Sequence, residues 1–114
     1  MSTITLYHGT DVDGARDLLT TGVLASSAAR YNVSGEFWAS TSSMVADFFA
    51  ASNPAGGPPA RFEFEVDETV LQDLIARQLV ICHLQPDWTD YEFLPGCFGT
   101  LNSQMGNKRV VILP

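Results

Sequence analysis

The sequence has few basic residues, two cysteines and no long apolar run. Only 6 of its 114 residues are Lys or Arg, against 13 Asp or Glu, so the formal net charge is −7. Because proteins bind nucleic acids largely by neutralising phosphates, this balance argues against an extended nucleic-acid surface. The scattered arginines still leave room for a local cationic spot that holds one diphosphate.

The chain also lacks features of membrane-bound and secreted proteins. No apolar stretch approaches the ~18 residues that a membrane helix needs, and residues 1–9 lack the basic and apolar segments of a signal peptide. Two cysteines do not make a disulfide framework. We therefore expect a cytoplasmic protein without membrane attachment.

Cys82 and His83 are adjacent, and this pair raises the question of a metal site. Neighbouring residues of a strand point to opposite faces, so the two side chains do not easily share one ion. We expect no metal site, and we expect Cys82 to be a core residue.

What the sequence does contain is typical of one globular domain. Apolar residues make up 46% and charged residues 17% of the chain. A chain of this length can bury roughly two-thirds of its unfolded surface, so residues 1–114 are expected to form a single domain.

Hydrophobic periodicity and the positions of capping and turn residues predict a mixture of strands and short helices. Strands are predicted over residues 4–7, 36–40, 61–66, 80–84, 89–94 and 109–113, with residues 80–84 as a buried strand. Three helices are predicted, beginning after Thr10 or Asp11, after Ser42 or Ser43, and after Asp67. The order lacks strict strand–helix alternation, so we expect an α+β domain.

Two segments have apolar patterns that predict which of their side chains are buried. Phe62, Phe64 and Val66 alternate with polar residues and should point inward. In the second helix, Val45, Phe48 and Phe49 recur at the spacing of one helix face, which is typical of a buried face. Residues 25–34 are expected to form a polar loop.

Three local patterns are candidates for chemistry. The first is Tyr7-His8-Gly9-Thr10 at the end of the opening strand. An imidazole next to a glycine lies beside backbone that a ligand can approach closely, which suits a flat ligand with an amide and a sugar hydroxyl. Taken alone, the pattern fits a structural histidine at a strand end at least as well.

The second and third patterns are aromatic and acidic. Gly35 to Thr41 includes Phe37 and Trp38, and only one of these neighbours can line a cleft while the other enters the core. Asp90 and Glu92 are two residues apart and share a face of a late strand. The ordinary alternatives are core packing for the aromatic residues and a solvated face for the acids.

The order of these three segments resembles the ADP-ribosyltransferase family. The YHGT strand, the strand with Trp38-Ala39-Ser40-Thr41 followed by an alanine-bearing helix, and the late glutamate are similar to compact bacterial members of the histidine–tyrosine–glutamate type. That type belongs to the group of diphtheria-toxin-like and poly(ADP-ribose)-polymerase-like enzymes. The resemblance implies two small antiparallel or mixed sheets around an NAD cleft, with three short helices.

The resemblance also implies roles for individual residues. His8 would bind the nicotinamide-side ribose, Gly9 would hold the carboxamide, and Thr10 would support the turn. Trp38 would take the stacking place usually held by tyrosine, with Phe37 as the alternative. The remaining assignments are Tyr31 as a second stacking ring, Arg30 as a diphosphate contact and Glu92 as the catalytic carboxylate, for which Asp90, Glu63 and Glu65 are alternatives.

The implied activity is cleavage of the nicotinamide–ribose bond of NAD and transfer of ADP-ribose to an acceptor. The acceptor would be a protein, a nucleic-acid end or a small molecule, and a toxin-like role would bring an antitoxin or immunity partner. Trp38 in place of tyrosine keeps two alternatives open: an NAD-binding or interaction module without turnover, and an NAD glycohydrolase toxin.

Overall fold

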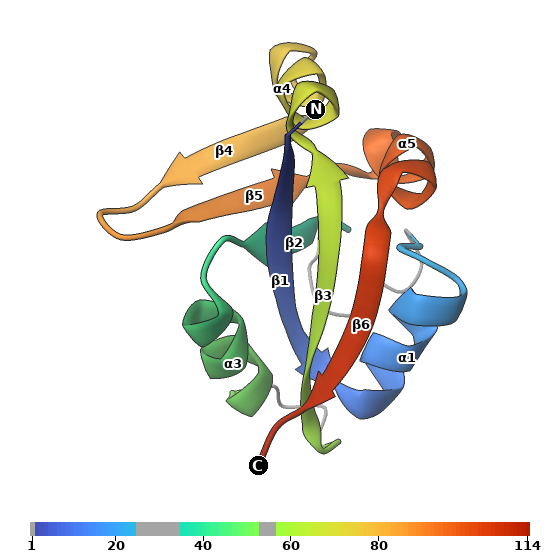
Figure 1. Cartoon of the computed structure of the whole chain (residues 1–114), viewed down its shortest axis with the longest axis vertical. Coiled ribbons are helices and arrows are strands. Elements are labelled where there is room, and N and C mark those ends of the chain that lie inside the picture. The colour runs from blue at the N-terminus through green and yellow to red at the C-terminus, as the bar shows by residue number, and fades with distance from the viewer. Residues whose placement is uncertain (1, 25–34, 53–56) are drawn as a thin grey trace.

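The computed structural model of the chain describes residues 2–24, 35–52 and 57–114. The strands form one six-stranded antiparallel sheet in the order β4-β5-β2-β1-β3-β6 (Figure 1). The strands are β1 (Thr3–Asp11), β2 (Phe37–Ser40), β3 (Pro59–Asp67), β4 (Val80–Leu84), β5 (Thr89–Phe93) and β6 (Gly106–Ile112). The helices are α1 (Val12–Thr20), α3 (Ser43–Ala51), α4 (Glu68–Ala76), α5 (Phe98–Gln104) and the short 3-10 helix η1 (Pro95–Cys97).

The α+β class is confirmed, but the predicted counts of sheets and helices are wrong. The described residues form one sheet and four α-helices, where two sheets and three helices were expected. The reason is the junction between β1 and β2, where the single pair Tyr7–Ser40 joins two three-stranded halves. By contrast, β1 and β3 pair along the whole of β1, and β4 and β5 run across the direction of β1, β3 and β6 (Figure 1).

The predicted helix starts are confirmed by their capping hydrogen bonds. The Asp11 carboxylate accepts from the backbone N–H of Gly14 at 2.7 Å, and the Asp67 carboxylate accepts from that of Thr69 at 2.7 Å. The Ser42 hydroxyl accepts from the backbone N–H of Val45 at 3.3 Å. Each contact satisfies a donor that the first helical turn leaves without an intrahelical partner.

The main core lies on one face of the sheet. Phe62, Phe64 and Val66 are buried, as their alternation predicts. They pack with Phe37 and Phe93 from the other half of the sheet, and helices α1, α4 and α5 contribute apolar side chains to the same cluster. Burying this common face therefore stabilises both halves of the sheet together.

Helix α3 packs on the sheet with a different face from the predicted one. Its buried residues are Ala46 and Ala50, while Phe48 and Phe49 are 68% and 60% exposed. A Cβ atom at Gly9 would lie 1.9 Å from the Ala46 carbonyl oxygen. Because the helix backbone lies this close to β1, only small side chains fit between them, and the aromatic residues point outward.

Strand β4 is also less buried than predicted. It forms an edge of the sheet, and of its five residues only Val80 is buried. Cys82 is exposed, so its assignment to the core is wrong, while Cys97 is the buried cysteine. Although the strand is apolar in sequence, its edge position leaves most of its side chains outside the core.

Candidate functional site

Three side chains from neighbouring strands meet on one face of the sheet. Trp38 of β2 lies directly opposite Glu92 of β5, so their side chains share a face. His83 of β4 reaches the same place: its Nε2 is 3.0 Å from Glu92 Oε1, and its ring centroid is 5.0 Å from that of Trp38. We call Trp38, His83 and Glu92 the strand cluster.

The strand cluster encloses its carboxylate without fully burying it. The Glu92 side chain is 18% exposed and that of His83 is 39% exposed. A carboxylate in such a setting is partly shielded from water, which strengthens its interaction with nearby positive charge. The arrangement can therefore stabilise a cation that develops beside the indole.

His8 belongs to a different group of contacts. Its ring stacks on Phe37, with centroids 4.3 Å apart and planes at 28°. Its Nδ1 bonds to the backbone carbonyl of Trp38. A carbonyl oxygen only accepts, so Nδ1 carries the proton and Nε2 is the unprotonated nitrogen of the neutral ring. Burial lowers the pKa of His8 to about 4, so the imidazole is neutral at pH 7.

The predicted site residues therefore fall into two groups around β2. Phe37 and Trp38 point to opposite faces because they are neighbours on a strand. The structure places the His8 ring with Phe37, and it places Glu92 with the Trp38 side chain. The Trp38 backbone links the two groups, because its carbonyl holds the imidazole.

The rest of the first motif is packed rather than open. Helix α3 makes the close approach to Gly9, through the backbone of Ala46 and Ala50. Thr10 is 5% exposed. Arg30 and Tyr31, the predicted diphosphate contact and second stacking ring, lie outside the described residues.

The alternative carboxylates have other neighbours. Glu63 binds Arg61 at 2.8 Å and Arg109 at 3.3 Å, and Arg61 also binds Asp47 at 2.7 Å. These residues form an ion-pair network on the half of the sheet that holds β3 and β6. Glu65, on the same strand, accepts hydrogen bonds from Asn107 and Thr3. Neither β3 carboxylate is part of the strand cluster.

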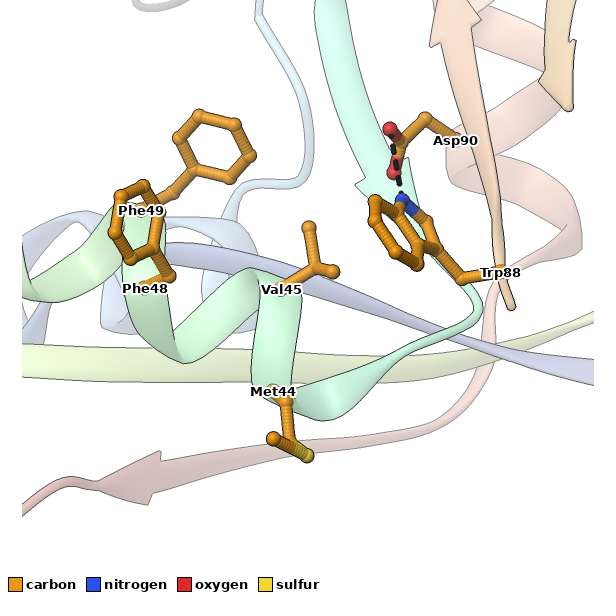
Figure 2. A pocket seen from close by; sticks show the side chains of 6 residues that line it. All are labelled: Met44, Val45, Phe48, Phe49, Trp88 and Asp90. Atoms are coloured by element: carbon orange, nitrogen blue, oxygen red, sulfur yellow. Dashed lines mark hydrogen bonds between the residues drawn. The ribbon is translucent and has the colours of Figure 1, made fainter. Parts of the chain in front are cut away.

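Asp90 shares a face of β5 with Glu92, and it lines a pocket that sequence reasoning missed. The pocket has a volume of about 410 Å³ and is lined by six side chains from α3, from the residue before β5 and from β5 itself: Met44, Val45, Phe48, Phe49, Trp88 and Asp90 (Figure 2). All of them except Asp90 are aromatic or aliphatic. Trp88 Nε1 donates to Asp90 Oδ2 at 3.2 Å, as the dashed line marks. We call this the aromatic pocket.

A sequence signal for the aromatic pocket did exist. Ala46 and Ala50 are four residues apart and form a small-residue face, which is the face that packs closely on β1. Phe48 and Phe49 lie outside that face, so they were the residues left to the surface. Large exposed aromatic residues that gather around a hollow are a common feature of binding sites.

Comparison of the chain with models of protein families, with curated proteins and with solved structures finds no match in any of the three. Among the described residues, no group of three or more His, Cys, Asp and Glu is arranged to hold a metal ion. None of the helices in the described ranges is long and apolar enough to cross a membrane.

Proposed function

We propose that this protein is an NAD-dependent ADP-ribosyltransferase in which Glu92 is the catalytic carboxylate. The observation that carries the proposal is the position of Glu92, directly opposite Trp38 and largely enclosed by Trp38 and His83. A flat ring against the indole would bring an attached sugar near the carboxylate. The resemblance of the three motif segments to ADP-ribosyltransferases gives the ring and sugar their proposed identity.

The proposed reaction breaks the bond between the nicotinamide nitrogen and C1′ of the ribose. The bonding electron pair leaves with nicotinamide, which becomes neutral, and the sugar acquires oxocarbenium character. The Glu92 carboxylate would hold the ribose 2′-hydroxyl and stabilise this positive charge. A lone pair of the acceptor then forms the new bond at C1′, and the acceptor loses its proton to solvent or a base.

The neutral imidazole of His8 supports the proposed site from the other face of β2. Its Nδ1–H donates to the Trp38 carbonyl, which holds the backbone of the strand that presents the indole to Glu92. The low pKa of His8 keeps its ring neutral at pH 7. The hydrogen bond also ties the imidazole to the strand that carries the stacking residue.

The aromatic pocket supplies further stacking surface for a planar ring. Phe48 and Phe49 expose their rings on α3, and Trp88 faces them across the pocket (Figure 2). Asp90, which shares its face with Glu92, connects this pocket to the strand cluster. We assign Phe49 as an additional candidate for the second ring, beside Tyr31.

The test is nicotinamide release from NAD, measured with acceptors from a cell extract and with water alone. We expect release by the wild-type protein and a loss of about 100-fold or more in Glu92→Gln, because the stabilising charge is removed. Glu68→Gln, at an exposed position on α4, is the matched control and should keep full activity.

The same assay separates the alternatives. Loss of activity in Asp90→Asn or Glu63→Gln, with Glu92→Gln unaffected, would move the catalytic role to that carboxylate. Free ADP-ribose formed without any acceptor would identify a glycohydrolase. No nicotinamide under any condition would contradict the enzymatic proposal.

One observation favours a second function, an NAD-binding module without turnover. Trp38 stands where the resemblance implies a tyrosine. Calorimetric titration with NAD that gives binding, together with no nicotinamide release, would support this function.

A further inference from the structure

We propose that His83 is a positioning residue that aims the Glu92 carboxylate and lowers its effective charge when the imidazole is protonated. This inference rests on the proposed function, and it gives the site a pH-dependent control that the family resemblance does not supply. It follows from contacts between β4, β5 and β2.

The register of the three strands brings His83 to Glu92. His83 lies opposite Asp90, and Glu92 lies opposite Ile81 on one side and Trp38 on the other. His83 therefore reaches Glu92 diagonally, one pair along the ladder, which is within reach of a long side chain. The imidazole and the indole thus come from the two strands that flank β5, and their rings meet with centroids 5.0 Å apart.

The contacts with His83 and Trp38 fix one orientation of the Glu92 carboxylate. With its Nε2–H donating, His83 holds Oε1 at 3.0 Å. The ring of Trp38 packs 5.0 Å from the ring of His83, which limits how far the imidazole can swing. A glutamate has three side-chain torsions, so a fixed donor at one oxygen removes much of its freedom and leaves Oε2 for substrate.

The charge on the imidazole decides how strongly it offsets the carboxylate. A histidine ring is neutral or carries one positive charge, depending on its protonation. A neutral His83 leaves the full negative charge on Glu92, whereas a protonated one forms an ion pair and offsets that charge. Activity is therefore expected to fall as the pH is lowered.

The other charged groups around His83 are acidic, so none of them can offset the charge of Glu92 as a protonated His83 would. From β5 the imidazole faces Asp90 and Glu92, and from β2 it faces the uncharged Trp38. Helix α4 also packs against β4, and its Glu68 acts on Tyr91, which is on the opposite face of β5. The charges on the His83 side are thus acidic, and each of them attracts a protonated imidazole.

The kinetic test compares His83→Ala and His83→Gln in the nicotinamide-release assay. We expect His83→Ala to lower kcat about 10- to 100-fold with little change in KM for NAD, because the carboxylate is misplaced. His83→Gln keeps an N–H donor without a titrating charge, so it should recover most of kcat and lose the wild-type decline at acid pH. Leu84→Ala, at an exposed position on the same strand, should behave as wild type.

Unchanged kcat in His83→Ala, or an acid decline that persists in His83→Gln, would overturn the inference. Equal losses in kcat for the alanine and glutamine variants would do so as well, because the donor would then make no difference.

A second readout does not depend on turnover. In a Trp88→Phe background, Trp38 is the one tryptophan left, and an adjacent protonated imidazole quenches indole fluorescence. We expect the emission to fall as the imidazole is protonated by lowering the pH, to stay flat when His83→Gln is added, and to fall less when Glu92→Gln releases the imidazole. A decline of the same size with and without the Glu92 carboxylate would contradict the positioning contact, even if the protein proves to have no enzymatic activity.

Discussion

At the scale of single residues, Gly9 shows most directly how the sequence limits the packing. A Cβ atom at this position would lie 1.9 Å from the Ala46 carbonyl oxygen and 2.8 Å from the Ala50 nitrogen. Both contacts are to helix backbone, which cannot rotate away as a side chain can. The glycine is therefore required by the approach of α3 to β1, whatever role it has toward a ligand.

We predict that Gly9→Ala lowers the free energy of unfolding by about 2–3 kcal/mol, because α3 must move away from the sheet. Urea denaturation of the purified variant measures this change. Gly99→Ala is the control: nothing lies within 4 Å of its Cβ position in α5, so the change should be neutral or slightly stabilising. Equal stability of the two variants would contradict the packing of α3 described above.

His8 leads to a pH prediction. Its pKa is lowered by burial to about 4, while an unfolded histidine titrates near 6.5. The unfolded state therefore binds more protons between these values, and the stability of the folded state falls as the pH drops from about 6.5 toward 4. Above that window both states hold a neutral ring, and the effect is absent.

We expect the free energy of unfolding of the wild type to fall more than that of His8→Gln when the pH is lowered from 7 to 4. The extra loss in the wild type should be up to about 3 kcal/mol. Urea denaturation of both proteins across this range measures the shift, and the subtraction removes the contribution of the other titrating groups. A difference that does not change with pH would show that the imidazole is hydrated in the folded protein.

At the scale of elements, local sequence patterns predicted the features that short-range interactions determine. The alternation in β3 identified its buried side chains, and the capping residues identified the starts of three helices. The buried face of α3 was predicted wrongly, because Val45, Phe48 and Phe49 are a regular apolar stripe. What decided the packing was a glycine on a strand more than thirty residues away in sequence.

The error at β4 has a similar origin. A short apolar run fits a central strand and an edge strand equally well, because strand order depends on pairings along the whole chain. The edge position leaves Cys82 exposed, whereas Cys97, the last residue of η1, is buried. Burial also raises the pKa of the Cys97 thiol, which makes it a poorer nucleophile.

We therefore predict one fast-reacting thiol in the native protein. A thiol reagent such as dithionitrobenzoate should modify one cysteine rapidly at neutral pH, and both cysteines after denaturation. Cys82→Ser should abolish the fast phase, while Cys97→Ser should leave it intact. A fast phase that survives in Cys82→Ser would show that β4 is covered or that the region around Cys97 opens.

At the scale of the whole molecule, the sequence predicted the class of the fold and part of the candidate site. Trp38 and Glu92, more than fifty residues apart, do lie opposite each other on adjacent strands. His83 was considered only as a possible metal ligand with Cys82, and its contact with Glu92 depends on the register of the β4–β5 hairpin. The aromatic pocket required knowledge of which α3 face packs, so it was not predicted.

The arrangement of the two half-sheets could not be predicted from the residues either. One pair, Tyr7–Ser40, joins them, and the Trp38 carbonyl binds His8 across the same junction. The first motif and the strand cluster are thus connected through β2. The proposed NAD site lies beside this junction, on the face of β2 and β5 that carries Trp38 and Glu92.

The most direct test is a crystal structure of Glu92→Gln, chosen to slow turnover, soaked with NAD. We predict that the nicotinamide ring stacks on Trp38, with the attached ribose beside residue 92 on the same face of the sheet. Electron density for NAD at a different surface, or none at saturating concentration in a crystal that leaves this face open, would contradict the proposed site.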